Sequence, residues 1–137
     1  MVVFVDTSAF YALMTLDDPN HRAALAQWDI WQKSDEIPGL QTSNYVVLET
    51  ISLIQNRLGL EAVRSFQGEI IPLITIQWVT DSLHAQGVAT LLAAKRRRLS
   101  LVDCMSFVIM RHFSIDTAFA FDRHFTEEGF HLYPNGV

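Results

Sequence analysis

Short apolar runs alternate along the chain with longer segments in which apolar residues recur at helical spacing. Residues 2–6 and 117–121 are apolar runs that predict strands buried on both faces, and the chain reaches an aspartate, Asp6 or Asp122, as each run ends. Residues 70–79 predict a further strand, in which Pro72 favours an edge position or an entry loop. Residues 131–133 predict a last edge strand.

The predicted helices carry start and stop signals. Ser100 is followed three positions later by Asp103 and then by an apolar run, the pattern that opens a helix, here over residues 101–113. Gly59 ends another helix, which begins after a cap at one of residues 42–44. Further helices are predicted over residues 7–16, capped by Thr7 or Ser8, and over residues 21–33, 60–69 and 81–94, while residues 34–40 are predicted as a loop.

Strands therefore alternate with helices throughout, and the sequence contains no internal repeat. That order predicts an α/β sandwich with a mostly parallel sheet. A length of 137 residues is that of one compact domain, so we expect a single domain over residues 1–137.

Composition narrows the possible functions. Half of the residues are hydrophobic and only 18% are charged, which excludes a disordered acidic chain. The formal charge of −5 does not favour bulk attraction to nucleic acid, so RNA or DNA binding would need a local basic patch or metal ions. No apolar stretch is long enough to span a membrane, and the start of the sequence carries no basic leader. We therefore expect a cytoplasmic protein without a membrane segment.

Four acidic residues stand against apolar backgrounds: Asp6, Glu49, Asp103 and Asp122. Asp6 and Asp122 end strands, and the carboxyl ends of strands are where ligands bind in open α/β sheets. Asp103 in a first helical turn would lie at the same edge. Alternatively, Asp103 only complements the helix dipole, which contributes roughly 0.3–1 kcal/mol, and Glu49 belongs to a solvent-facing stripe with Ser52 and Asn56.

Clustered carboxylates repel one another, and a hard divalent cation would resolve that repulsion. All four candidate ligands offer oxygen and no two histidines have a paired spacing, so Mg²⁺ or Mn²⁺ is favoured over zinc. Such a metal suits phosphodiester hydrolysis. The four consecutive cations Lys95, Arg96, Arg97 and Arg98 exceed what the dipole at a helix C-terminus needs, and we predict that they bind RNA phosphates.

Four segments together resemble the PIN-domain proteins found as VapC-type toxins in bacterial toxin–antitoxin pairs. They are VDTSAF with Asp6, VVLETISLI with Glu49, LSLVDCMSFVIM with Asp103 and AFAFDRHF with Asp122, in the family's order. The resemblance implies a three-layer α/β/α sandwich and a magnesium- or manganese-dependent ribonuclease, inhibited by a cognate antitoxin and assembled as a homodimer. It makes those four acids catalytic, with Asp6, Asp103 and Asp122 as metal ligands and the Thr7 hydroxyl as a helper to the metal shell.

The chain departs from the family's pattern at Ala120, where many relatives place a polar or acidic residue, so the number of metal ions stays open. Two other functions also stay open. One is a PIN-like module that only binds a partner. The other is an aspartate-based receiver or phosphatase, although a haloacid dehalogenase-type phosphatase needs an acid two residues after the first aspartate, where this chain has Ser8.

Overall fold

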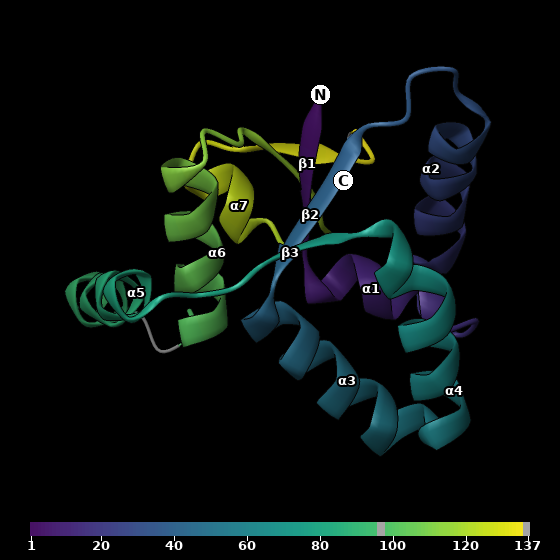
Figure 1. Ribbon diagram of the computed structural model, residues 1–137, viewed down its shortest axis with the longest axis horizontal. Coiled ribbons are helices and arrows are strands. Elements are labelled where there is room, and N and C mark those ends of the chain that lie inside the picture. Colours follow the sequence, from purple (N-terminus) through teal and green to yellow (C-terminus); the bar gives the residue numbers. More distant parts are fainter. Residues whose placement is uncertain (96–97, 136–137) are drawn as a thin grey trace.

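The structure, a computed structural model, describes residues 1–95 and 98–135. Its centre is a sheet of five parallel strands in the order β3-β2-β1-β4-β5 (Figure 1). The strands are β1 (Val2–Val5), β2 (Gly39–Ser43), β3 (Thr75–Gln77), β4 (Thr117–Phe119) and β5 (His131–Tyr133). The predicted α/β fold with a parallel sheet is confirmed, and β3 and β5 are the edge strands.

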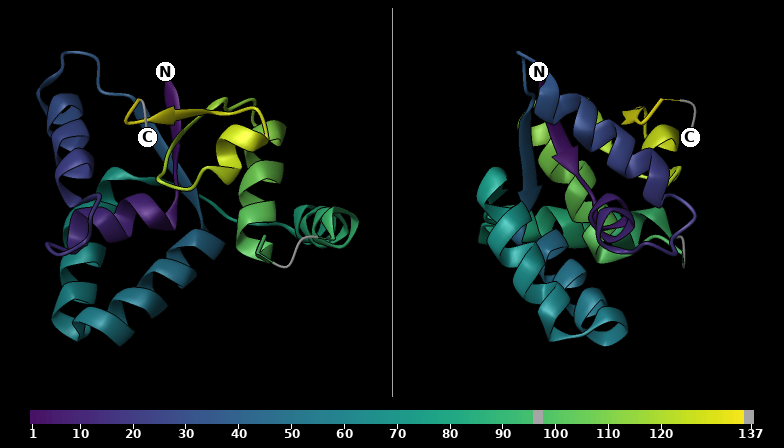
Figure 2. Two further views of the ribbon diagram at one scale, coloured as in Figure 1. Left: turned by 180° about the vertical axis from the view of Figure 1, so that it is seen from behind. Right: turned by 90° about the vertical axis from the view of Figure 1, so that its right-hand side faces the viewer.

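Helices cover the sheet on both sides, which makes an α/β/α arrangement (Figures 1 and 2). One side carries α1 (Thr7–Met14), α2 (His21–Lys33), α3 (Asn44–Leu58) and α4 (Leu60–Ser65), which connect β1 to β2 and β2 to β3. The other side carries α5 (Asp81–Ala94), α6 (Leu101–His112) and α7 (His124–Glu127). The direction of strand order reverses after β3, and right-handed crossovers then place the later helices on the opposite face.

The core between these layers is largely aromatic. Its largest fully buried side chains include Phe4, Phe107 and Phe119, and Trp31 of α2 meets Phe119 edge-to-face with ring centroids 5.2 Å apart. Cys104 is buried among these residues and is a free thiol. Strands β1 and β4 are hydrophobic because helices cover both of their faces.

Strand β2 was not predicted: the sequence places a loop over residues 34–40, and the strand covers residues 39–43. The helix cap expected at one of residues 42–44 is confirmed, because the Ser43 hydroxyl accepts the Val46 amide at the start of α3. The β2 sequence GLQTS contains one large apolar residue. Thr42 and Ser43 are nevertheless fully buried, and the Thr42 hydroxyl donates to the Val5 carbonyl at 2.7 Å. Satisfied hydroxyls let polar residues occupy a central strand, so the hydrophobic pattern alone misses it.

Several boundaries also differ from the prediction. The N-cap of α1 is Asp6, where Thr7 or Ser8 was expected. The strand predicted over residues 117–121 ends at Phe119, and the helix predicted over residues 60–69 is α4 followed by a π-helical turn, Phe66–Ile70. A 3₁₀ turn, Ile71–Leu73, contains Pro72 and leads into β3. Within the described part of the chain, no helix is long and apolar enough to cross a membrane.

Candidate active site

An acidic group lies beyond the carboxyl ends of β1 and β4. One donor atom each from Asp103, Asp122 and His124 lies within 4.8 Å of the other two, and all three residues are half-buried. Asp103 comes from the first turn of α6, and the other two from the turn that begins α7. Asp6 follows β1 directly, and its carboxyl group is close enough to Asp103 and Asp122 to feel their charges. The structure thus brings Asp6, Asp103 and Asp122 to one place.

Asp6 is the most deeply buried member of this group, with 4% of its surface exposed. Burial raises the pKa of the Asp6 carboxyl to about 7, and the negative charges of Asp103 and Asp122 act in the same direction. Hydrogen bonds from Ser8 oppose this rise: the Ser8 hydroxyl donates to Oδ2 of Asp6 at 2.6 Å and the Ser8 amide donates to the same oxygen at 3.1 Å. Asp6 is therefore a carboxyl group that loses its proton near neutral pH when no metal is bound.

Ser8 was not identified from the sequence as a site residue. Its hydroxyl also accepts a hydrogen bond from the Phe121 amide at 2.9 Å, so it ties the start of α1 to the loop that follows β4. This bond fixes the Asp6 carboxyl relative to the loop that carries Asp122. The signal in the sequence is the position of Ser8 two residues after a strand-ending aspartate, where a hydroxyl can bond back to that carboxyl.

Asp103 has two roles in the structure. It forms a capping box with Ser100: its amide donates to the Ser100 hydroxyl at 3.1 Å, and its Oδ2 accepts the Ser100 amide at 3.1 Å. Burial raises the pKa of Asp103, with a further contribution from the charge of Asp122, against the opposing Ser100 bonds. Asp103 can therefore cap the helix and belong to the acidic group at the same time, because the capping bond uses only one of its two carboxylate oxygens, Oδ2.

His124 was missed because a single histidine near an aspartate has no spacing typical of a metal site. Its amide donates to Oδ1 of Asp122 at 2.9 Å. Its ring Nδ1 lies 3.0 Å from the same oxygen but in an alignment that makes no hydrogen bond, and this buried nitrogen has no hydrogen-bond partner among the described residues. An unpaired buried nitrogen beside two carboxylates fits a divalent metal ion.

Glu49 and Thr7 stand apart from this group. The Thr7 hydroxyl accepts from the Thr50 hydroxyl at 3.1 Å and donates to the Val46 carbonyl at 3.5 Å, so it joins α1 to α3. Glu49 is half-buried in the second turn of α3 and lines two surface hollows. Ser52 and Asn56 are exposed, in agreement with the solvent-facing stripe considered from the sequence. With Thr7, Glu49 and Leu53 they line a hollow of about 610 Å³.

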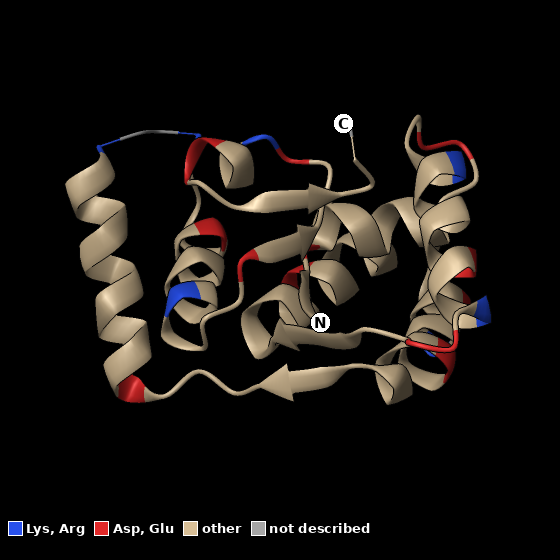
Figure 3. Cartoon of the chain, turned by 90° about the horizontal axis from the view of Figure 1, so that it is seen from above, with Lys and Arg blue, Asp and Glu red and all other residues tan. Residues whose placement is uncertain are grey.

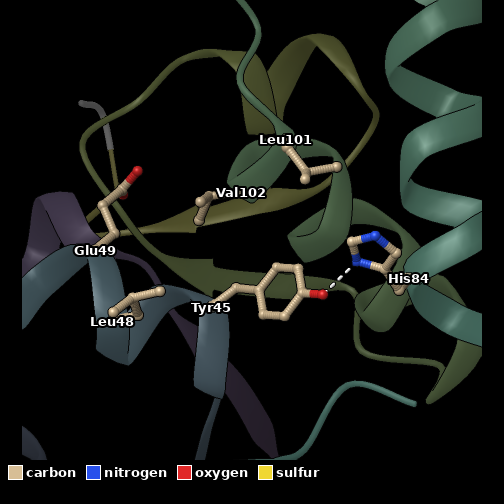
Figure 4. A pocket seen from close by; sticks show the side chains of 6 residues that line it. All are labelled: Tyr45, Leu48, Glu49, His84, Leu101 and Val102. Atoms are coloured by element: carbon tan, nitrogen blue, oxygen red, sulfur yellow. Dashed lines mark hydrogen bonds between the residues drawn. The ribbon is translucent and has the colours of Figure 1, made fainter. Parts of the chain in front are cut away.

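The second hollow, of about 530 Å³, is apolar and also has Glu49 in its wall (Figure 4). It is lined by Tyr45, Leu48, Glu49, His84, Leu101 and Val102. The Glu49 side chain stands at one end of this hollow, and the hydrogen-bonded pair of Tyr45 and His84 stands at the other. Leu101 and Val102 directly precede Asp103, so the wall of the hollow and a member of the acidic group share one helical turn.

Of the predicted RNA-binding cations, Lys95 follows α5 directly and Arg98 precedes α6; Figure 3 shows Lys and Arg in blue. Lys95 and Arg98 are exposed, whereas Arg96 and Arg97 lie outside the described residues. Ser100, the N-cap of α6, follows Arg98 by two residues, so this segment leads into the turn that carries Asp103. Ala120 is fully buried, and its amide donates to the Tyr133 carbonyl at 3.2 Å.

The chain is similar to known proteins over nearly its whole length. The model of the PIN domain family matches residues 3–130. Two Mycobacterium tuberculosis proteins, both named 23S rRNA-specific endonuclease VapC20 and taken from different strains, are each 34% identical to the chain over 130 residues, which is 94% of this chain and 95% of the relative.

Solved structures give the same result. The crystal structure of M. tuberculosis VapC20, described as a sarcin–ricin loop cleaving toxin, matches with a TM-score of 0.83 and 32% identity over 95% of this chain and 96% of that one. FitAcB from Neisseria gonorrhoeae matches with a TM-score of 0.67 over 96% of both chains, at 16% identity. The latter likeness supports the fold alone.

Proposed function

The chain belongs to the PIN domain family, and from that premise we propose that it is a metal-dependent endoribonuclease whose residues 1–137 form one nuclease domain. The observation that carries the proposal is the group of Asp103, Asp122 and His124, with the buried Asp6 carboxyl beside it. A set of convergent carboxylates with one unpaired ring nitrogen is the kind of arrangement that holds a metal in phosphodiester hydrolysis.

We assign Asp6, Asp103 and Asp122 as metal ligands and add His124 to them. The set stays rich in oxygen, which favours Mg²⁺ or Mn²⁺. When bound, such an ion lowers the pKa of water and offsets the charge that develops on the phosphate oxygens. Ser8 keeps the Asp6 carboxyl oriented through its two hydrogen bonds, and Thr7 positions α1 against α3. Glu49, across from α6, is assigned to orient the attacking water and remove its proton.

The proposed substrate is structured ribosomal RNA, because relatives 34% identical over nearly the whole chain are named for cleavage of 23S rRNA. We further propose that the chain is the toxin of a toxin–antitoxin pair, acts in the cytoplasm and is inhibited by a cognate antitoxin protein. The homodimer implied by the family resemblance stays a prediction.

The alternatives make different predictions. A haloacid dehalogenase-type phosphatase lacks its second acid here, because Ser8 occupies that position and donates a hydrogen bond to Asp6. A PIN-like module that only binds RNA or a partner would retain binding and show no cleavage.

A cleavage assay on a stem-loop RNA that carries the sarcin–ricin loop sequence tests the proposal. Chelation should abolish cleavage, and added Mg²⁺ or Mn²⁺ should restore it. The products should end in a 5′-phosphate and a 3′-hydroxyl, since water and not the ribose hydroxyl attacks. Asp122→Asn should lose activity, whereas Asp116→Asn, a change of an exposed acid outside the group, should retain it. Full activity after exhaustive chelation, or cyclic phosphate ends, would refute the proposal.

A further inference from the structure

We propose that the apolar hollow between α3, α5 and α6 binds an unpaired nucleobase next to the scissile phosphate of the RNA. This inference rests on the proposed function and adds a binding site to it. The hollow is the one lined by Tyr45, Leu48, Glu49, His84, Leu101 and Val102 (Figure 4).

The position of the hollow connects it with the acidic group. Glu49 forms one end of its wall, and Leu101 and Val102 lie two residues and one residue before Asp103 in the first turn of α6. A phosphate held at the acidic group would therefore have the hollow directly beside it. The base of the nucleotide attached to that phosphate can therefore enter the hollow.

The chemistry of the walls selects a base over a phosphate. Glu49 is the one lining residue with a formal charge at neutral pH, and its carboxylate repels phosphate groups. Apolar and aromatic side chains make the rest of the lining, and Leu48 is 68% exposed at the rim. A planar, uncharged base covers such a surface.

Tyr45 and His84 supply an aromatic surface at the far end. Their hydrogen bond joins the Tyr45 hydroxyl to Nδ1 of His84, and the two rings meet edge-to-face with centroids 5.8 Å apart. The bond holds both rings in place before RNA arrives. Among the described residues none is hydrogen-bonded to Nε2 of His84, so this nitrogen is available to the edge of a base.

RNA recognition supports this occupant. Proteins that read RNA loops usually bind bases that have left the helical stack, placing them on aromatic side chains. A volume of about 530 Å³ is ample for one base. An enzyme that cuts within a loop needs such a contact to hold the strand in one register.

The test uses the stem-loop RNA with single abasic nucleotides placed in turn on each side of the cleaved bond. One flanking position should lower kcat/KM of the wild type roughly five- to a hundredfold, which is the effect of removing one stacked base. In His84→Ala and Tyr45→Ala the same abasic substitution should cost little more, because the aromatic surface is already incomplete. His112→Ala is the matched control, since His112 is also exposed and packs edge-to-face on a neighbouring ring, Phe113, but at the far end of α6.

Binding gives a second measurement that does not depend on cleavage. Asp122→Asn should bind the intact RNA more tightly than the abasic RNA, and adding His84→Ala should remove that difference in fluorescence anisotropy. An equal abasic penalty in the wild type and in both hollow variants would overturn the base site while leaving the nuclease intact. A change of molecular mass in His84→Ala, with an unchanged abasic penalty, would assign the hollow to a second copy of the chain and also overturn it. Absence of any cleavage by the wild type would instead count against the proposed function, and the binding comparison would still decide the site.

Discussion

Burial and two neighbouring negative charges both oppose ionisation of the Asp6 carboxyl. Asp6 is buried beside Asp103 and Asp122, and only the Ser8 bonds favour its charged form. A carboxyl with a pKa of about 7 in the folded protein and near 3.8 in the unfolded chain binds its proton more tightly when folded. In the metal-free protein, the stability supplied by this group is therefore fully present below about pH 4 and is lost as the pH rises toward 7.

Replacing the Asp6 carboxyl tests the direction of this pH dependence of stability. Asp6→Asn keeps an oxygen that can cap α1 but removes the charge. With a chelator present, we expect the variant to be more stable than the wild type at pH 8, by on the order of a few kcal/mol, and therefore to melt at a higher temperature. At pH 4, where the wild-type carboxyl is protonated in the folded protein, the two should differ little. Thermal melts followed by circular dichroism at both pH values measure it. Equal differences at the two pH values would contradict the assignment.

Asp103 allows its two roles to be separated. Asp103→Asn retains an acceptor for the Ser100 amide, whereas Asp103→Ala loses the capping box. We expect Asp103→Ala to unfold at lower urea concentration than Asp103→Asn, by about 1 kcal/mol in the free energy of unfolding, and both to lose cleavage. Ser100→Ala is the control, since it weakens the same cap without changing the acidic group. If Asp103→Asn were as unstable as Asp103→Ala, the capping bond would not depend on the side-chain oxygen.

At this scale the sequence predicted the acids better than their partners. Asp6, Asp103 and Asp122 could be found because strand ends and a capping box mark their positions. Ser8 and His124 could not, because a serine or a single histidine is common near any turn, and only the fold places their polar atoms on the carboxylates. Glu49 was found by its apolar neighbours, which show that it is unusual but not which group it faces.

At the scale of elements, the strands and helices with strong local signals were predicted and those held by tertiary contacts were not. Helix α6 has its cap, its acidic first turn and its basic last turn in the sequence, and it was placed correctly. Strand β2 depends on the Thr42 hydroxyl reaching Val5, a bond between residues 37 positions apart. A hydrogen bond between residues so far apart produces no periodic hydrophobic pattern in the sequence.

The segment between α5 and α6 carries a prediction of its own. An acidic protein needs local cations to hold RNA, and Lys95 and Arg98 are exposed just before the turn that bears Asp103. Replacing Arg96 and Arg98 by Gln should weaken RNA binding and lower the slope of log K against log salt by roughly 0.7 for each phosphate that the variant no longer neutralises.

Filter binding at several salt concentrations measures that slope. Arg64→Gln combined with Arg111→Gln is the control with the same change of charge, because each of these arginines is paired with a carboxylate, Glu61 or Glu128. An unchanged slope in the Arg96 and Arg98 variant would assign the segment to structure or to the antitoxin.

At the scale of the whole molecule, the sheet order assembles the site. Strands β1 and β4 are neighbours at the centre of the sheet although more than a hundred residues separate them. Their carboxyl ends bring Asp6 and the loop of Asp122 together, and the N-terminus of α6 adds Asp103 from the other layer (Figure 1). The acids from these three distant parts of the chain therefore interact with one another only when the whole fold is formed.

Metal binding should for that reason stabilise the folded chain as a unit. The unfolded chain scatters the ligands, so an ion that binds only the folded state adds RT ln(1 + [L]/Kd), about 2.7 kcal/mol at a hundred times Kd. We expect millimolar Mg²⁺ or Mn²⁺ to raise the melting temperature of the chelator-treated wild type by several degrees, and that of Asp103→Asn much less.

Asp116→Asn controls for the loss of a negative charge elsewhere on the surface. Calorimetry over a range of metal concentrations separates this mass-action effect from simple screening by salt, since NaCl of equal ionic strength should not reproduce it. A wild type whose melting temperature ignores both metals would show that the three distant segments do not form an ion site, and the nuclease proposal would fall with it.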